Sequence, residues 1–465
     1  MLMSDDSPSL TVELLRRTLA LFDRERMLLQ VEIVDHSEAF LELAISSPTG
    51  GSVTLLFVGG EALPERFDMS ASRVTGGDRG RLSLFANGHE THLELRTLGD
   101  LFVLDGPGCD ALVRTRDGRA VWTRRRRMGR TVVAIGTALS SDLLTYRQGL
   151  EENVHSDLRT EALFGFPNER PIYLYEGVAD PTMPYDRQAD WWSKILFESL
   201  QDDLFPTTGT TTSKPVRYLV ITGDDDQADL ETYDEQQKIL RGMPITYFLH
   251  PLTHHTRGSI RRLHRANPQV EFGLHPDALD NPERYDDLFS KQVDWFRNLT
   301  GTTPLSVRNH GFLSDAYWNH LRSWIAHGVR ASSNIPGLDG RILSNSLVPF
   351  PLALDGEITD HWSIVTSFGD GMIFALEMSD EEASQKIEVF ASRMAADPID
   401  GALVVNLHPQ NVERARKLHH AVRDLVDDGF VPVTLSSLIQ VYGAGRIPET
   451  RGFRTRLGLS RRRRS

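Results

Sequence analysis

The stretch Tyr218-Leu-Val-Ile-Thr-Gly-Asp224-Asp225-Asp226 decides the fold of the second half of the chain. It is a short apolar run, the length of a buried strand, that leads directly into three carboxylates. From residue 215 onward such runs alternate with amphipathic helices, which is the pattern of a parallel sheet covered by helices. The sequence therefore predicts an α/β domain at residues 215–445, built as a (β/α) barrel or an open relative of one.

Six buried strands are expected in this domain, at residues 218–222, 245–249, 270–274, 305–308, 402–407 and 431–435. Between them, apolar residues recur at helical spacing over residues 285–299, 317–324 and 412–425. The second and third of these helices are expected to end at Gly328 and Gly429, because glycine readily adopts the backbone conformation that closes a helix.

The first half of the chain follows a different pattern. Four apolar residues at helical spacing predict one leading helix: Val12, Leu15, Leu19 and Phe22. Short alternating runs then fill residues 28–139, with glycine-rich breaks and a tight hairpin expected at Asp117-Gly118. This pattern favours an antiparallel sandwich or barrel, and so a β-rich N-terminal domain at residues 1–145. Residues 146–214 are interpreted as a connector that could belong to the barrel domain, and residues 446–465 as a basic tail.

Composition narrows the class of protein. A chain of 465 residues, 40% of them hydrophobic, is long enough for two ordinary domains. The net charge of -13 and the lack of a basic face argue against nucleic acid as a partner. The single cysteine, Cys109, excludes an internal disulfide, and no apolar run approaches the roughly 18 residues that would span a bilayer. The start MLMSDDSPSL has no basic region followed by an apolar run, so a cytoplasmic location is expected.

Titratable residues stand where chemistry is expected in such a fold, just after the carboxyl ends of strands. Four of the six expected strands end this way, on Asp224-Asp225-Asp226, on His275, on Arg308 with His310, and on His408. Adjacent carboxylates repel one another, so crowding them in a cleft requires a compensating cation or a bound proton. Two imidazoles and a carboxylate form a ligand set typical of catalytic zinc and of harder divalent ions. The acidic run by itself also fits an acidic loop with one Asp capping the next helix.

A second group of histidines comprises His250, His254, His255 and His264. These residues lie in a polar, arginine-containing loop and helix and not at the end of an expected strand. We therefore interpret them as structural or surface residues.

The order of the motifs resembles the polysaccharide deacetylases, the family 4 carbohydrate esterases with the NodB-homology fold, over residues 215–442. This resemblance implies a distorted (β/α) barrel. The segment Thr222 to Asp225 is similar to the family's Thr-Phe-Asp-Asp motif, which implies that Asp224 is the catalytic base and Asp225 a metal ligand. By the same resemblance His275 is the first metal-binding histidine, Arg308 the arginine that holds the base, and His408 the general acid.

The family's penultimate strand is matched only loosely. Residues 347–351, followed by Asp355, Asp360 and Trp362, are similar to that strand and to the Asp and Trp associated with it.

Two positions depart from the family pattern. Gly223 replaces an aromatic residue, and Leu279 stands where the second histidine ligand is expected, four residues after His275. Leucine cannot bind a metal ion. We expect His310 to supply the missing imidazole, because it lies two residues beyond Arg308 and therefore on the same side of the strand end.

The resemblance implies a metal-dependent hydrolase that removes an acetyl group from an N- or O-acetylated sugar, with zinc as the expected metal and a carbohydrate as the substrate. Asp225, His275 and His310 would hold the ion. Asp224, oriented by Arg308, would take a proton from the attacking water, and His408 would protonate the leaving group.

Two alternatives remain open. Leu279 favours a glycan-binding or inactive relative, in which a decayed site still recognises sugar. Another metal hydrolase on a barrel, such as one acting on cyclic amides, would need a His-x-His pair after an early strand and a bridging lysine, and neither is evident in the sequence.

Overall fold

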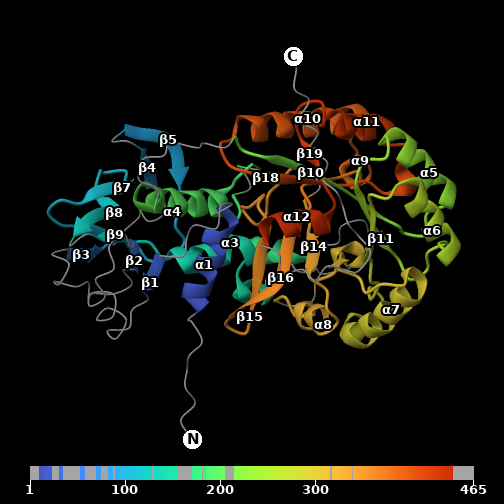
Figure 1. The fold of residues 1–465 in the computed structure, drawn as a ribbon, viewed down its shortest axis with the longest axis horizontal. Coiled ribbons are helices and arrows are strands. Elements are labelled where there is room, and N and C mark those ends of the chain that lie inside the picture. The colour runs from blue at the N-terminus through green and yellow to red at the C-terminus, as the bar shows by residue number, and fades with distance from the viewer. Residues whose placement is uncertain are drawn as a thin grey trace, which may run out of the picture.

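The computed structural model describes residues 10–22, 31–34, 53–57, 70–74, 82–86, 89–127, 130–155, 170–180, 183, 185–204, 214–314, 317–337 and 339–443. These residues form two halves joined by helices of the predicted connector (Figure 1). The predicted basic tail, residues 446–465, lies outside the described residues. None of the described helices is long and apolar enough to cross a membrane.

The first half contains one leading helix and a mixed sheet. The helix, α1, spans Leu10–Phe22. The strands are β1 (Val31–Val34), β2 (Val53–Phe57), β3 (Ser70–Arg73), β4 (Leu82–Ala86), β5 (His89–Leu95), β6 (Phe102–Asp105), β7 (Asp110–Thr115), β8 (Ala120–Arg127) and β9 (Arg130–Ile135). Seven of them form one sheet in the order β1-β2-β9-β8-β7-β4-β5, and β3 pairs with β6 apart from it.

The hairpin expected at Asp117-Gly118 is confirmed, since β7 and β8 pair antiparallel and Gly118 has a φ of 87°. The antiparallel arrangement expected for this whole region is wrong at one edge, where β1, β2 and β9 pair in parallel. Alternating apolar residues indicate a strand but not the direction of its neighbour. Because β2 and β9 are far apart in the sequence, no turn signal reveals how they pair.

The connector packs against both halves. It contains the end of α3 (Leu139–Gln148), which begins within the predicted N-terminal domain, the 3-10 helices η2 (Glu151–His155) and η4 (Pro171–Tyr175), and α4 (Gln188–Leu204). Arg187 donates from Nε to Asp190 and from Nη1 to Asp397, each at 2.8 Å, and all three side chains are buried. Trp192 of α4 packs on Trp122 of β8, with 5.2 Å between ring centroids. One cluster of buried side chains therefore runs from α1 and the first sheet through α4 into the second half.

The second half is built on a ten-stranded sheet. Its strands are β10 (Arg217–Asp224), β11 (Ile245–Leu249), β12 (Val270–Leu274), β13 (Ser306–Val307), β14 (Ala331–Ile335), β15 (Phe350–Leu354), β16 (Glu357–Val365), β17 (Phe368–Gly369), β18 (Gly401–Asn406) and β19 (Val431–Pro432). The order is β15-β16-β14-β13-β12-β11-β10-β18-β17, with β19 on β10. All pairs are parallel except β15 with β16. Within the described residues no backbone pairing joins β17 to β15.

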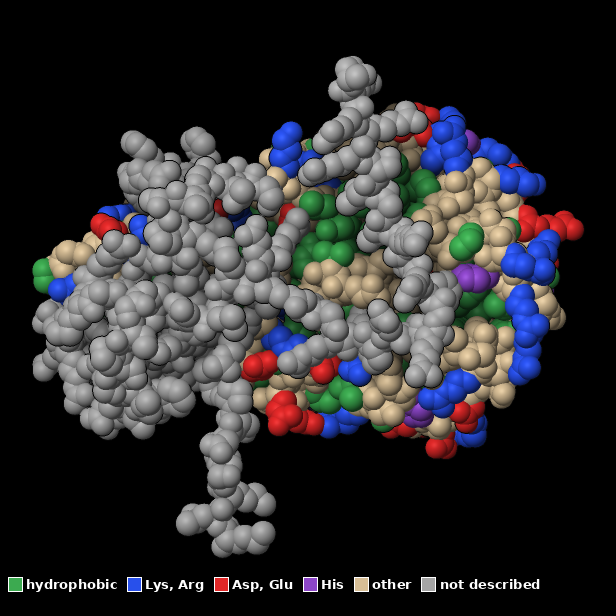
Figure 2. All heavy atoms as spheres, in the orientation of Figure 1, with side chains coloured by type: hydrophobic (Ala, Val, Ile, Leu, Met, Phe, Trp, Pro, Cys, Tyr) green, Lys and Arg blue, Asp and Glu red, His purple; other side chains and the backbone are tan. Residues whose placement is uncertain are grey.

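Helices cover this sheet on its outer side (Figure 1). They are α5 (Leu230–Ile239), α6 (Arg257–Ala266), α7 (Tyr285–Thr300), α8 (His320–Ala326), α9 (Gly371–Ala375), α10 (Asp380–Ala396), α11 (Arg416–Asp424) and α12 (Leu435–Tyr442), with short 3-10 turns η5 (Pro282–Arg284), η6 (His310–Phe312) and η7 (Pro409–Asn411). Figure 2 shows charged side chains along the outer edge over α5, α6 and α11. Helix α6 illustrates the pattern, because Ile260 and Leu263 are buried while its arginines are exposed.

The six predicted strands of this half are present as β10, β11, β12, β13, β18 and β19, although β13 and β19 have only two residues each. Strands β14, β16 and β17 are additional to those expected, and β15 overlaps the segment 347–351 that loosely resembles the family's penultimate strand. The middle of β14 is Ser332-Ser333-Asn334, which is buried but polar, so a search for apolar runs passes over it. Gly328 follows the C-cap of α8 with a φ of 79°, as expected. Helix α11 instead ends at Asp424, and Gly429, with a φ of 90°, closes the turns that follow it.

Candidate active site

The carboxyl ends of β10, β12, β13 and β18 meet at one cavity of about 260 Å³. Five of the titratable residues singled out in the sequence line it: Asp224, Asp226, His275, His310 and His408. Parallel strands that share a sheet place their carboxyl ends at one edge, which is why residues up to 184 positions apart come together here.

Asp224 is the last residue of β10 and is almost fully buried. Its Oδ1 accepts from Arg308 Nη1 at 2.9 Å, and its Oδ2 accepts from Asn406 Nδ2 at 2.8 Å. Burial by itself would raise the pKa of Asp224, but the charges of Arg308, His275 and His408 hold this pKa below its usual value. The side chain is therefore an oriented, ionised carboxylate.

Arg308 is completely buried, and each of its three guanidinium nitrogen atoms donates to an oxygen atom of a neighbouring segment. Besides Asp224, it donates to Thr222 Oγ1 at 3.0 Å, to Thr366 Oγ1 at 3.1 Å, and to the carbonyl and hydroxyl oxygens of Ser333 at 3.0 and 3.1 Å. The guanidinium makes one hydrogen bond to Asp224 and not a bidentate pair. It therefore holds Oδ1 of Asp224 and leaves Oδ2 to other groups.

His408 follows β18 and faces the same carboxylates. Its Nε2 lies 3.6 Å from Asp224 Oδ2 and 3.5 Å from Asp226 Oδ2. Its Nδ1 donates to Asp370 Oδ1 at 2.6 Å, while its backbone N–H donates to Asp370 Oδ2 at 2.8 Å. Burial would lower the pKa of His408, but Asp370 first, and then Asp226 and Asp224, raise it to about 10. The ring is therefore protonated at neutral pH.

Asp370 was missed in the sequence. It follows the two-residue strand β17 and is fully buried beside His408. The loosely matched carboxylates lie elsewhere, since Asp355 pairs with Arg322 and Asp360 pairs with Arg17. The rule that placed the other site residues, a titratable group just after a strand, would have found Asp370 if β17 had been recognised.

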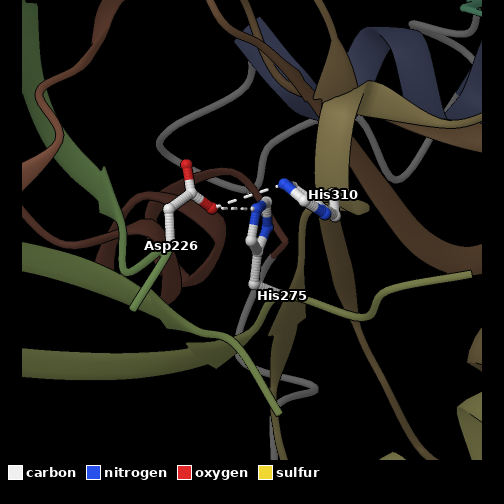
Figure 3. A group of neighbouring side chains, drawn as sticks. All are labelled: Asp226, His275 and His310. Atoms are coloured by element: carbon white, nitrogen blue, oxygen red, sulfur yellow. Dashed lines mark ion pairs between the residues drawn. The ribbon is translucent and has the colours of Figure 1, made fainter. Parts of the chain in front are cut away.

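Asp226, His275 and His310 form a group that could hold a metal ion (Figure 3). Oδ1 of Asp226 lies 3.2 Å from His275 Nε2 and 3.7 Å from His310 Nε2. His275 Nδ1 donates to the carbonyl oxygen of Arg308 at 2.6 Å, which leaves a lone pair on Nε2. Within the described residues neither His275 Nε2 nor Asp226 Oδ1, both buried atoms, has a hydrogen-bond partner of good geometry.

The charges around this group favour a positive charge between Asp226 and the two histidines. Burial would lower the pKa of His275, yet Asp224 and Asp226 raise it, because the carboxylates draw a cation to this place. Burial would likewise raise the pKa of Asp226, but His275, His408 and His310 hold it well below its usual range. A carboxylate and two imidazoles with inward lone pairs are a donor set that fits a divalent ion.

Asp225 is not part of this group. Its carboxylate accepts from the Tyr233 hydroxyl and, at 3.2 Å, from the backbone N–H of His250. Burial raises the pKa of Asp225, and bonds from Thr253 and Tyr233 only partly offset this. The chain leaves β10 at Asp224 and turns, and in this turn Asp224 and Asp226 line the cavity while the carboxylate between them contacts Tyr233 of α5. Asp226, and not Asp225, therefore lies beside His275 and His310.

The backbone dihedral angle φ is positive at two successive residues of this turn. Asp226 has a φ of 39° and Gln227 a φ of 64°, a left-handed region that is costly for residues other than glycine. Gly223, the other departure from the family motif, has a spatial reason, because a Cβ atom there would lie 2.6 Å from the carbonyl oxygen of Leu407. The strand end carrying the carboxylates and the one carrying His408 are thus packed backbone to backbone.

Several solved protein structures are similar to about half of this chain. No family model and no curated protein matches the chain. It is similar to a candidate polysaccharide deacetylase from Mycobacterium smegmatis, with 15% identity, a TM-score of 0.39, and coverage of 52% of this chain and 92% of that one. It is also similar to the allantoinase PuuE, with 12% identity, a TM-score of 0.39, and coverage of 51% of this chain and 93% of that one. A third similar structure is a family 4 acetyl xylan esterase from Clostridium thermocellum in complex with cobalt, with 16% identity, a TM-score of 0.31, and coverage of 48% of this chain and 92% of that one. The family that the motifs resemble recurs among the similar structures.

Proposed function

We propose that this protein is a metal-dependent hydrolase that removes an acetyl group from an N- or O-acetylated sugar. One observation carries the proposal: the buried lone pairs of Asp226 and His275 converge with His310 beside an arginine-held carboxylate and a protonated histidine. Metal ligands, a base and an acid around one cavity are the parts that acyl transfer to water requires. Zinc is the proposed ion, and the parallel sheet is proposed to be a distorted barrel of the NodB-homology type.

Asp226, His275 and His310 are the residues that would hold the ion. When bound, a divalent ion lowers the pKa of its water and polarises the acyl oxygen of the substrate. This assignment moves the carboxylate ligand from Asp225 to Asp226 and keeps His310 as the substitute for the histidine missing at Leu279.

Asp224 is the proposed base. Its Oδ1 is bonded to the Arg308 cation, while Oδ2 accepts from the neutral amide of Asn406 and lies 3.6 Å from His408 Nε2. Oδ2 is therefore the proposed acceptor of a proton from the attacking water. Arg308 keeps this carboxylate ionised and fixes its plane, and it does so without lining the cavity itself.

His408 is the proposed acid. Its raised pKa keeps a proton on Nε2 at neutral pH, and this proton passes to the leaving nitrogen or oxygen atom. Phe312 and Phe374 line the same cavity and offer apolar surface to a sugar ring.

The proposal is tested by metal content and acetate release together. Protein purified without added metal should contain, or take up on dialysis, about one zinc ion per chain, and should release acetate from oligomers of N-acetylglucosamine or from acetylated xylan. A chelator should abolish this release and zinc should restore it. His408→Gln should keep the metal and lose about 10²- to 10⁴-fold in kcat, the usual contribution of a general acid. A chain that takes up no divalent ion would refute the proposal.

The alternative of an inactive, glycan-binding relative rests on Leu279. It predicts sugar binding by a protein that takes up metal weakly or not at all and releases no acetate from any acetylated glycan. Isothermal titration with the same oligomers, run beside the acetate assay, separates the two functions.

A further inference from the structure

His250 was interpreted from the sequence as a structural or surface residue, but it lies directly behind the proposed metal group. It follows β11, is 2% exposed, and its ring centroid is 5.0 Å from that of His310. Asp277 lies between the two rings, with Oδ2 at 3.2 Å from His250 Nε2 and Oδ1 at 3.4 Å from His310 Nδ1. One carboxylate therefore faces a nitrogen atom of each ring.

The hydrogen on His250 can be placed from its neighbours. Its Nδ1 accepts the backbone N–H of Leu252 at 3.1 Å, so this nitrogen carries no hydrogen. The ring hydrogen is then on Nε2, and Asp277 Oδ2, which can only accept, takes it. Two separate contacts thus agree that His250 donates to Asp277.

Asp277 is held in place by its own backbone. Its N–H donates to Gln292 Oε1 at 2.9 Å, and its carbonyl oxygen accepts from Gln292 Nε2 at 2.7 Å. Oδ1 also accepts the backbone N–H of Leu279 at 3.1 Å. Leu279, which stands where the family has its second histidine ligand, therefore supplies a main-chain N–H that orients this carboxylate.

His310 presents its two nitrogen atoms to two different carboxylates. Its backbone is fixed by a bond from its N–H to the carbonyl oxygen of Pro276 at 2.9 Å. Nδ1 of His310 lies 3.4 Å from Asp277 Oδ1, a close electrostatic contact and not a well-aligned hydrogen bond. The negative charge of Asp277 favours a hydrogen on this nitrogen, which leaves the lone pair of Nε2 facing Asp226, 3.7 Å away. Histidines that bind metal usually donate their other N–H to a carboxylate or carbonyl oxygen in this way.

We propose that His250 and Asp277 are positioning residues that fix the tautomer of His310, so that its Nε2 is the atom offered to the metal. This inference rests on the proposed function, since it concerns the ligand that replaces the missing histidine. His275 is fixed in the same sense by the carbonyl oxygen of Arg308, and both imidazoles thus turn Nε2 towards Asp226.

His250, Asp277 and His310 also lie close enough to be a second metal site. The hydrogen bonds argue against that use, because the nitrogen of His250 that faces Asp277 carries a hydrogen and has no lone pair to give. One ion per chain is therefore expected, and a second ion that depends on His250 would overturn the proposal.

The first experiment needs no metal. In metal-free protein with ¹⁵N-labelled histidine, the ring signals of His310, assigned by their loss in His310→Gln, should report hydrogen on Nδ1. Asp277→Asn should shift His310 towards the Nε2–H form, and Asp287→Asn, at an exposed position on α7, should not. Hydrogen on Nε2 of His310 in the unaltered protein would overturn the proposal, whether or not the chain binds metal.

The second experiment measures zinc affinity by competition with a chromophoric chelator. Asp277→Asn should weaken zinc affinity about 10- to 100-fold, as loss of such partners usually does. The metal-free variant should stay folded with a somewhat lower melting temperature, because the amide has one acceptor oxygen for the bonds from His250 and Leu279. His250→Gln, which keeps an N–H donor, should bind zinc more tightly than His250→Phe, which has none. Equal zinc affinity of Asp277→Asn and the unaltered protein would overturn the proposed role of Asp277 and His250. If the unaltered protein binds no zinc, the proposed function fails. The tautomer of His310 then still decides whether Asp277 and His250 position this ring.

Discussion

Asp370 holds His408 from two sides, accepting from the ring Nδ1 at 2.6 Å with one oxygen and from the backbone N–H at 2.8 Å with the other. This contact is the largest of those that raise the pKa of His408 to about 10. It fixes both the direction of Nε2 and the proton that Nε2 carries.

Asp370→Asn should therefore lower the pKa of His408 and move the basic limb of the pH profile of kcat to lower pH. The amide can still accept from one N–H group, so the fold should persist. Acetate release measured from pH 6 to pH 10 checks this shift. An unchanged basic limb with reduced kcat would mean that Asp370 orients the ring without setting its charge.

The raised pKa of His408 also couples stability to pH. Its value is 6.5 for an ordinary histidine and about 10 in the folded protein. The stabilising contribution is then complete below about pH 6.5 and is lost as pH rises through about 10. Metal-free protein should lose unfolding free energy over this window, and His408→Gln should lose less. Urea titrations at three pH values test this, and parallel curves for the two proteins would contradict it.

Asp225 and Asp226 should behave differently although they are neighbours. Asp226→Asn should lose zinc and activity, because its Oδ1 faces both histidines. Asp225→Asn should keep zinc and lose about 1–3 kcal/mol of stability, because the amide has one acceptor oxygen and its NH₂ group cannot accept the second bond from Tyr233 or the His250 backbone. Metal content and urea titration of both variants decide the matter. Loss of zinc in Asp225→Asn at unchanged stability would return the ligand role to Asp225.

Arg308→Lys should be severe. A lysine cannot reach the several oxygens that the guanidinium bonds, and it would leave Asp224 unpaired in a buried site. Breaking a buried pair of this kind typically costs about 3–5 kcal/mol of stability. Denaturant titration should show this loss together with loss of turnover. Arg322→Lys, which alters an exposed pair with Asp355, is the matched control and should change stability little.

Gly223→Ala tests the close contact between β10 and the segment after β18. The added Cβ would lie 2.6 Å from the carbonyl oxygen of Leu407, next to His408, so about 1–3 kcal/mol of stability and much of the activity should be lost. Gly258→Ala in α6 meets only Thr256 Oγ1, at 3.5 Å, and should be tolerated. Equal stability of the two variants would show that β10 can move without cost.

The sequence predicted the location of the candidate site more closely than the atoms that form it. Strand-end placement brought Asp224, His275, His310 and His408 to one cavity. Side-chain alternation does not decide between Asp225 and Asp226, because the chain leaves the strand at Asp224 and Asp226 lies in a left-handed turn. Such a turn is not visible in a run of three identical carboxylates.

Two of the unexpected elements have different physical causes. Ser332 to Asn334 is a buried polar segment, stabilised by hydrogen bonds to Arg308 and Asn309. Apolar periodicity cannot reveal this segment, because its burial depends on partners from distant strands. The strand before Asp370, Phe368–Gly369, has only two residues, which are too few to show any periodicity. The parallel pairing of β2 with β9 was hidden for a related reason, since it depends on contacts between strands far apart in the chain.

The buried group of Arg187, Asp190 and Asp397, with the stacked Trp122 and Trp192, has a consequence for how the molecule can be handled. Truncation of the chain near residue 214 would remove Arg187, the cation that pairs with Asp397, and would expose apolar side chains of the second half to solvent. The second half should therefore not fold stably when it is separated from the first, and the protein should unfold in one cooperative step. Removal of the first sheet should disturb the candidate site, although the two are separate in the sequence.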